Sequence, residues 1–336
     1  MGELTQRQKN IATAVVEEHI TTAQPVGSEA LRRSHDFACS SATIRNEMVR
    51  LEERGYLDQP HTSAGRIPLG PAYRLHVDTL PAESGRLDRD VAWVQGELRR
   101  VAGRHETALR LSSAILSRIT RYPAVVIAPR ERGPRLIDLS LTPVSARNVL
   151  LSYLDDAGAS EEVLIETHQP VTVEEVAELE ALLHQRVLGR PLGSELPLEG
   201  VEIDAGLLAG LRQALEDASR GRVYVEGTTF ILDEPEFAEL DRLRRVISIL
   251  MQSPILRRAL DAGMAEEGPT VRIGPEHGIE PLRDCSVVAA SYSVDDRRTG
   301  VLGVLGPMRM RYEVALQMVE LIARNLGHAL SRAEEN

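Results

Sequence analysis

The fold of the N-terminal part of the chain is decided by residues 40–66, SSATIRNEMVRLEERGYLDQPHTSAGR. Ile44, Met48 and Leu51 recur at helical spacing, and the serines ahead of them can cap the first turn of a helix. Gly55 can end that helix in a left-handed conformation. The residues beyond it predict a short strand, a polar loop and a return strand. We therefore expect a helix that is followed at once by a β-hairpin.

The residues before this stretch supply two more helices. Residues 5–20 carry apolar side chains at helical spacing, residues 24–27 form a break, and Ser28 can cap a short helix over residues 29–33. Three helices and a hairpin predict a winged helix-turn-helix domain of about seventy residues. A single amphipathic helix with Arg and Asn outward is more often an ordinary solvated surface, but the ordered set of elements favours nucleic-acid binding.

The outward face of the helix in residues 40–66 is small and polar near its N-terminus, which suits entry into a DNA major groove. Arginine can read guanine, and asparagine can read adenine, through paired hydrogen bonds. An arginine in the hairpin can contact the phosphate backbone, although the loop could equally be an ordinary turn. The predicted DNA-binding residues are Ser41, Thr43, Arg45, Asn46 and Arg50 on the helix and His61, Thr62 and Arg66 in the hairpin.

The charge distribution sets a condition on DNA binding. The chain has 336 residues, which predicts two or three domains, and a formal net charge of −11 at pH 7. The first 76 residues hold nine basic and nine acidic side chains, so the rest of the chain carries the whole negative charge. DNA affinity therefore has to come from the placement of individual cations rather than from bulk charge. The candidate cations are Arg7, Lys9, Arg45, Arg50, Arg66 and Arg74.

We expect a cytoplasmic protein with no membrane partner. No apolar run approaches the length of a membrane span, and the first ten residues, MGELTQRQKN, contain no hydrophobic signal segment. The two cysteines, Cys39 and Cys285, are far apart and unlike a metal-ligand cluster, so both are expected to be buried, reduced thiols.

The remainder of the chain alternates between helices and strands. Residues 72–80 and 86–120 are expected to be largely helical. Strands are expected at residues 124–128, 136–141, 148–154, 163–167, 223–225, 271–273, 286–293 and 301–305, and further helices at 173–188, 204–219, 235–262 and 311–331. Gly300, Gly303 and Gly306 are expected to serve bends or close packing.

Catalytic chemistry has no support in the sequence. The motifs HExxH, GxSxG, GxxxxGK and CxxC are absent, and the nine histidines lack the spacing of metal ligands. We therefore expect no enzymatic activity, no cofactor and no metal site.

Several longer strings carry a family resemblance. In the N-terminal part they are PVGS at residues 25–28, SSATIRNEM, LEERGYL and above all QPHTSAGRIP at residues 59–68. In the C-terminal half they are Ile273-Gly274, CSVV at residues 285–288, Ser291-Tyr292, and residues 300–312, which end in GPMRMRY. On these strings the chain resembles the heat-inducible transcription repressors of the HrcA family, bacterial regulators of chaperone operons, over nearly its full length. It departs from the family at residues 69–72, where Pro71 is unusual, and at Arg311, where the family has an acid.

The resemblance implies an α+β multidomain fold with a winged helix-turn-helix, a GAF-like α/β domain and an inserted α/β dimerisation domain. The expected limits are residues 1–76 for the winged-helix DNA-binding domain, 77–104 for a helical linker, 105–143 with 226–336 for the GAF-like domain, and 144–225 for the inserted domain. The resemblance also implies a repressor of heat-shock chaperone operons. Such a repressor binds an inverted-repeat operator in double-stranded DNA as a homodimer, and the chaperonin assists its active state.

Two other functions remain open at this point. The shorter string SATIRN also resembles the sugar-operon repressors of the DeoR type, and GAF-like folds often hold ligands. The alternative is therefore a small-molecule-responsive winged-helix repressor of a metabolic operon. A polar-lined cavity in the body would favour it, whereas a core filled by Val287, Val288, Leu302 and Leu305 would leave no room for an effector. An enzyme with an appended DNA-binding domain is the third possibility, for which we find no residues.

Overall fold

The computed structural model describes residues 3–61, 64–81, 88–128, 134–156, 160–198, 200–219, 221–295 and 297–331. Thr62, one of the predicted DNA-binding residues, lies outside these ranges. The chain divides into two compact units, which are residues 1–127 with 223–336, and residues 128–222. Both contain helices and strands, which confirms the predicted α+β class.

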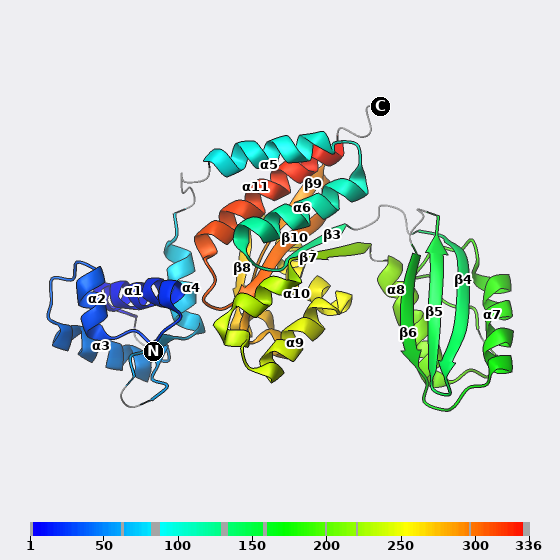
Figure 1. Ribbon diagram of the computed structural model, residues 1–336, viewed down its shortest axis with the longest axis horizontal. Helices are drawn as coiled ribbons and strands as arrows, with labels where there is room; N and C mark the ends of the chain where they lie inside the picture. Colours follow the sequence, from blue (N-terminus) through cyan, green and yellow to red (C-terminus); the bar gives the residue numbers. More distant parts are fainter. Residues whose placement is uncertain are drawn as a thin grey trace. The chain divides into compact units, whose positions relative to one another are not determined.

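The N-terminal elements follow the predicted order, as Figure 1 shows. They are α1 (Gln6–Thr22), α2 (Ser28–Ser34), α3 (Ser41–Glu53), the paired strands β1 (Leu57–Asp58) and β2 (Ile67–Pro68), and α4 (Gly70–Thr79). Thr5 caps α1 in a reciprocal pair with Gln8, which satisfies backbone donors that the helix leaves free. The unusual Pro71 lies in the first turn of α4, where no backbone N–H is needed. We refer to residues 5–79 as the N-terminal segment.

A five-stranded sheet forms the centre of the first unit, in the order β7-β3-β10-β9-β8. Its strands are β3 (Ala124–Ala128), β7 (Arg222–Glu226), β8 (Thr270–Ile273), β9 (Cys285–Val294) and β10 (Arg297–Pro307). The helices around it are α5 (Asp88–Arg100), α6 (His105–Thr120), α9 (Leu240–Leu250), α10 (Ser253–Ala265) and α11 (Tyr312–Ser331). Helices α9 and α10 lie on one side of the sheet, and α6 and α11 lie on the other (Figure 1). We refer to this sheet and its helices as the body.

The glycines of β10 allow the body to pack closely, as predicted. A Cβ atom on Gly303 would lie 2.4 Å from the backbone oxygen of Val288, and one on Gly300 would lie 2.4 Å from the backbone oxygen of Ile127. Only glycine fits at such distances. Cys285 is buried at the start of β9, whereas Cys39 is half-buried, so the expectation that both thiols are buried is wrong for Cys39.

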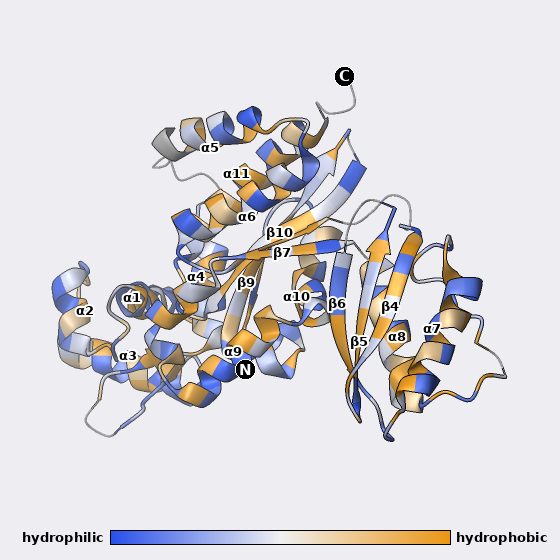
Figure 2. Cartoon of the chain, turned by 45° about the vertical axis from the view of Figure 1, so that its right-hand side comes forward, coloured by the Kyte–Doolittle hydropathy of each residue, from blue (hydrophilic) through white to orange (hydrophobic). Residues whose placement is uncertain are grey.

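The second unit is a three-stranded antiparallel sheet with two helices. The strands are β4 (Leu136–Ser145), β5 (Asn148–Asp155) and β6 (Ser160–Glu166), and the helices are α7 (Val173–Val187) and α8 (Ala205–Ser219). Alternate residues of β5, such as Val149 and Leu151, are buried under α7 and α8. Much of strand β5 is hydrophobic (Figure 2).

The limits of this unit differ from the expected limits of the inserted domain, residues 144–225. The unit begins at residue 128, because β4 pairs with β5 from Leu136 to Ser145 and belongs to the same sheet. It ends at residue 222, because β7 joins the sheet of the body. The expected helical linker, residues 77–104, is occupied by the end of α4 and by α5, and residues 82–87 between them lie outside the described ranges.

Candidate nucleic-acid interface

The N-terminus of α3 is held by its serine cap and by its apolar face. The Oγ atom of Ser40 accepts a hydrogen bond of 3.2 Å from the backbone N–H of Thr43. Ile44, Met48 and Leu51 are buried beneath the helix. The cap is therefore Ser40 rather than Ser41, and the opposite face of α3 is left to solvent.

Ser41 and Thr43 are half-buried at the start of α3 and are partly engaged by neighbours. The Thr43 hydroxyl lies 3.0 Å from Ser40 Oγ. Arg32 and Ser41 donate hydrogen bonds to the Glu29 carboxylate, and these bonds hold its pKa below the usual value. The bond from Ser41 connects the start of α3 to α2. Both hydroxyl groups thus help to set the orientation of the helix start.

Arg45 and Asn46 are the most available polar side chains of α3. Both are exposed, and neither makes a hydrogen bond or ion pair with another residue in the described part of the chain. Together they offer donors and an acceptor in the arrangement that base edges in a major groove can pair with. Arg50 is also exposed, but its Nη1 donates to Glu47 Oε1 at 2.9 Å.

A buried polar contact behind α3 escaped the sequence analysis. Glu47 lies within the apolar stripe of α3, and its Oε2 accepts a hydrogen bond of 2.9 Å from Nε2 of Gln8 on α1. Both side chains are buried. The only signal for this contact in the sequence is a charged residue at a position where the helical period calls for an apolar one.

The hairpin has a third partner that the sequence analysis interpreted as a break. Val26 and Arg66 form an antiparallel bridge with two backbone hydrogen bonds of 2.8 Å. A Cβ atom at position 65 would lie 2.4 Å from the backbone of Val26, so only glycine fits there. The segment before α2 therefore fixes the base of the hairpin against the helices.

Arg66 is held in place by a carboxylate of α3. Its Nε donates to Glu52 Oε2 at 2.8 Å, and 13% of its side chain is exposed. A notch of about 220 Å³ lies between the hairpin and α3, and Ser28, Arg45, Gln59 and Arg66 are among its lining residues. The notch brings two arginines from the helix and the hairpin to one surface. His61 is exposed at the start of the loop.

Arg74, one of the candidate cations for DNA, is directed elsewhere. Its guanidinium group forms an ion pair with Glu276 of the body and donates to the backbone oxygen of Val271 at 2.7 Å. Arg74 is therefore engaged within the protein.

The central sheet of the body is packed with aliphatic side chains. The aliphatic side chains expected in the core lie on both faces of the sheet and are each no more than 2% exposed: Val287, Val288, Leu302 and Leu305.

Among the helices of the described residues, none has the length and apolar character of a membrane span.

Known proteins resemble this chain over most of its length. Residues 106–316 match the family model described as the HrcA protein C terminal domain. The chain is 35% identical to the heat-inducible transcription repressor HrcA of Symbiobacterium thermophilum, over 96% of this chain and 97% of that protein. It is 34% identical to the repressor of the same name from Moorella thermoacetica, over 98% of each chain.

A solved structure has a similar fold over nearly the whole chain. It is described as the crystal structure of a hypothetical protein at 2.2 Å resolution. The match covers 98% of this chain and 100% of the chain in that structure. The TM-score is 0.65 and the sequence identity is 26%. The family is not an enzyme class. The family model and the near-complete relatives show that the chain belongs to the HrcA family of heat-inducible transcription repressors.

Proposed function

We propose that the protein is a sequence-specific DNA-binding repressor of heat-shock chaperone operons, which binds an inverted-repeat operator as a homodimer. In this proposal the N-terminal segment is a winged helix-turn-helix, the body is a GAF-like domain, and residues 128–222 are the inserted dimerisation domain. The observation that carries the proposal is the free, exposed pair Arg45–Asn46 at the start of α3, beside a hairpin arginine.

The proposed contacts divide into two kinds. Arg45 and Asn46 pair with base edges, with Ser41, Thr43 and Arg50 beside them on the same helix. His61, Thr62 and Arg66 contact the DNA backbone or the minor groove. The Nε atom of Arg66 is occupied by Glu52, which leaves its two terminal nitrogens for a phosphate. The acidic remainder of the chain disfavours nonspecific wrapping of nucleic acid.

The proposed dimer surface is the open face of the β4-β5-β6 sheet. Ile137, Leu154 and Leu164 are exposed there, although the opposite face is covered by α7 and α8. Leu164 also lies opposite Leu150 on the neighbouring strand. Exposed leucines on an uncovered sheet face are suited to contact with another protein, and a second copy can pair with this face symmetrically.

The chaperonin is the second proposed partner. In this proposal, the chaperonin increases the population of the active repressor. This part of the proposal depends on the family membership. A chaperonin that only improves folding gives more active molecules of unchanged affinity, whereas one that selects an arrangement of the dimer changes the affinity itself.

A gel-shift assay tests the proposed function. Purified full-length protein is titrated against the promoter of its own chaperone operon and against random DNA of the same length, with and without chaperonin. We expect binding to the promoter at concentrations at least about a thousandfold lower than binding to random DNA. Equal affinities for the two DNAs would contradict the proposal. The small-molecule alternative is disfavoured by the aliphatic core of the body.

A further inference from the structure

Two arginines connect the N-terminal segment to the body, and neither has a role in the proposed DNA contact. Arg74 lies on α4 and bonds to the body, whereas Arg309 lies in the body and bonds to α1. We call these two contacts the arginine clasp. Both residues belong to the same compact unit of the chain.

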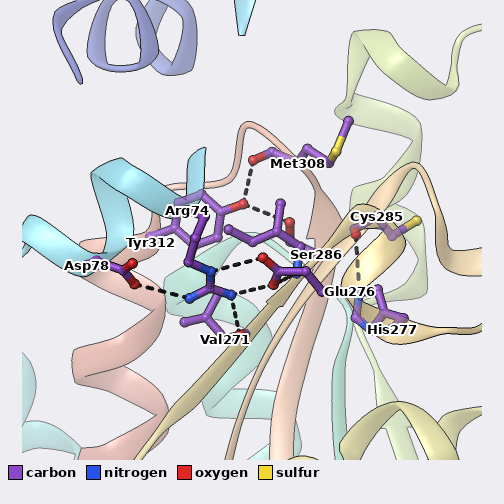
Figure 3. Close-up of polar contacts among 10 residues, drawn as sticks. Arg74, Asp78, Val271, Glu276, His277, Cys285, Ser286, Met308 and Tyr312 are labelled. Carbon is purple, nitrogen blue, oxygen red and sulfur yellow. Dashed lines mark hydrogen bonds and ion pairs between the residues drawn. The ribbon is translucent and has the colours of Figure 1, made fainter. Parts of the chain in front are cut away.

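The first half of the clasp is a two-pronged ion pair (Figure 3). The Nε of Arg74 donates to Glu276 Oε1 at 3.0 Å, and its Nη2 donates to the other oxygen of the same carboxylate. Nη2 also donates to the backbone oxygen of Val271 at 2.7 Å, and Nη1 donates to Asp78. A planar guanidinium paired in this way fixes direction as well as distance.

Glu276 is prepared for this contact by the body itself. Its Oε2 accepts the backbone N–H of Ile273 at 2.9 Å, at the end of β8. Burial opposes the charged form of Glu276, but the hydrogen bonds from Arg74 and from Ile273 prevail and hold the pKa of its carboxyl below the usual value. The backbone of Ile273 thus orients the carboxylate that Arg74 contacts.

The second half of the clasp holds the other side of the N-terminal segment. Arg309 forms ion pairs with Glu234 and Glu236, and its Nη1 donates to the backbone oxygen of Ile20 at 3.4 Å. The side chain is 13% exposed. It therefore holds the last turn of α1 against the body.

Two buried tyrosines lie between the halves. The rings of Tyr73 on α4 and Tyr312 on α11 are 6.3 Å apart, and the Tyr312 hydroxyl lies 2.7 Å from Ser286 Oγ. Tyr73 Oη also lies 2.9 Å from Nδ1 of His19 on α1. The aromatic rings contribute buried apolar contact, whereas the planar guanidinium groups of the arginines fix direction.

We propose that Arg74, Glu276 and Arg309 are positioning residues that fix the direction of α3 relative to the body, and thereby the half-site spacing that the repressor accepts. Three contacts link the body to α3. Glu276 of the body binds Arg74 on α4, and α4 packs on α1. Gln8 of α1 then donates a hydrogen bond to Glu47 of α3. In a dimer the two recognition helices have to lie about 34 Å apart, or a multiple of it, along the DNA. Without the arginine clasp, the N-terminal segment can change direction and adapt to several half-site spacings. With the clasp it accepts a single half-site spacing. The inference rests on the proposed DNA binding.

The test compares Glu276→Gln with Glu280→Gln in the full-length protein. Glu280 lies in the same part of the body, but its partner, Arg283, is also in the body, so this control removes a charge without opening the clasp. Affinities are measured for a single half-site, for the natural inverted repeat, and for a repeat whose half-sites are moved apart by about half a helical turn, roughly five base pairs.

We expect Glu276→Gln to lower the ratio of the natural-spacing affinity to the altered-spacing affinity by about tenfold, with half-site affinity unchanged within about twofold. Glu280→Gln should leave the ratio unchanged. An unchanged ratio for Glu276→Gln would overturn the inference while leaving the proposed function intact. Failure of the wild-type protein to prefer any inverted repeat would instead count against the proposed function.

If the wild-type protein prefers no inverted repeat, a measurement without DNA still tests the positioning role. Spin labels are attached to Cys39, which is half-buried in the N-terminal segment, and to Cys introduced by Asp261→Cys on the exposed side of α10. Cys285 is buried and should not react. We expect a narrow distance distribution in the wild-type background and a broader one with Glu276→Gln. Equal widths would overturn the positioning role.

Discussion

Gln8 and Glu47 join α1 to α3 through a hydrogen bond of 2.9 Å between Gln8 Nε2 and Glu47 Oε2, although 39 residues separate them in the chain. The contact is buried, and the second oxygen of Glu47 accepts from Arg50 at the surface. The carboxylate thus connects the interior of the N-terminal segment to the face proposed to meet DNA.

Replacing Gln8 with Leu should loosen α3 because it leaves a buried carboxylate oxygen without its donor, and it also removes the Gln8 half of the α1 cap. The expected cost is about 1–3 kcal/mol in the opening free energy of the α3 amides, measured by native-state hydrogen exchange. Gln6→Leu is the control, since Gln6 is exposed and its side chain bonds to Asn10 on the same helix. Equal protection of α3 in both variants would show that the buried contact contributes nothing.

Asn46→Ala or Arg45→Ala should reduce discrimination between bases. Each is expected to lose about 1–3 kcal/mol of preference for the operator over random DNA, which is the usual size of one good paired contact. The measurement is the ratio of the two affinities by fluorescence anisotropy at one salt concentration. Arg212→Ala removes a charge from an exposed site in the second unit and should leave the ratio unchanged. Equal losses on both DNAs would mean that Arg45 and Asn46 contact only phosphates.

Arg66→Ala should weaken binding to all sequences and lower the slope of log affinity against log salt by about one, as expected for one lost phosphate contact. Glu52→Gln is the matched variant, because it removes the partner of Arg66 but keeps the cation. It should weaken binding less and preserve the slope. If both variants weaken binding equally and neither changes the slope, Arg66 only supports the hairpin.

The sequence predicted the elements of the N-terminal segment well because their signals are local. The period of Ile44, Met48 and Leu51 defines α3, and Gly55 marks its end with a left-handed backbone. Contacts between distant residues have no such period. Val26 pairs with Arg66 through a single bridge, and Arg74 reaches Glu276 across 202 residues. Arg74 therefore looked like one more cation for DNA until its partner in the fold was known.

The limits of the second unit depend on strand pairing, which also joins residues that are distant in the sequence. Residues 136–145 have the composition of a strand, but composition does not say which sheet a strand joins. Pairing with β5 assigns β4 to the second unit, and pairing with β3 assigns β7 to the body. In the proposed interface, the choice of side chains followed from helix geometry, whereas the occupation of Arg50 and Arg66 by carboxylates did not.

Acidification should destabilise the body through His277. Burial lowers the pKa of this imidazole to about 4, against a usual value of 6.5, while its Nε2 lies 3.3 Å from the backbone oxygen of Cys285. Between these two pH values the unfolded chain binds a proton that the folded chain does not, so stability is full above about pH 6.5 and falls as the pH drops toward 4. The expected loss between about pH 7 and pH 5 is roughly 2 kcal/mol.

Hydrogen exchange of the β9 amides at about pH 7 and pH 5, corrected for intrinsic exchange, measures this loss. His277→Asn removes the titrating group and should flatten the pH dependence by the same amount, even where it lowers stability at both pH values. A variant with the full wild-type pH dependence would assign the effect to other groups.

The open face of the β4-β5-β6 sheet should carry the dimer contact. Leu164 is 59% exposed on the edge strand β6, so Leu164→Arg places a charge on the proposed interface without disturbing the covered face. We expect a monomer by analytical ultracentrifugation and a loss of about 10²–10⁴ in affinity for the inverted repeat, because two linked half-sites become independent. Affinity for a single half-site should not change.

Leu232→Arg is the matched control for this variant. Leu232 is 62% exposed but belongs to the first unit, so the same charge enters at an equally exposed leucine away from the sheet. The control should remain dimeric and bind the inverted repeat as the wild-type protein does. A dimeric Leu164→Arg protein with unchanged affinity would move the dimer contact to another surface, because a buried, unpaired arginine costs too much for the interface to persist around it.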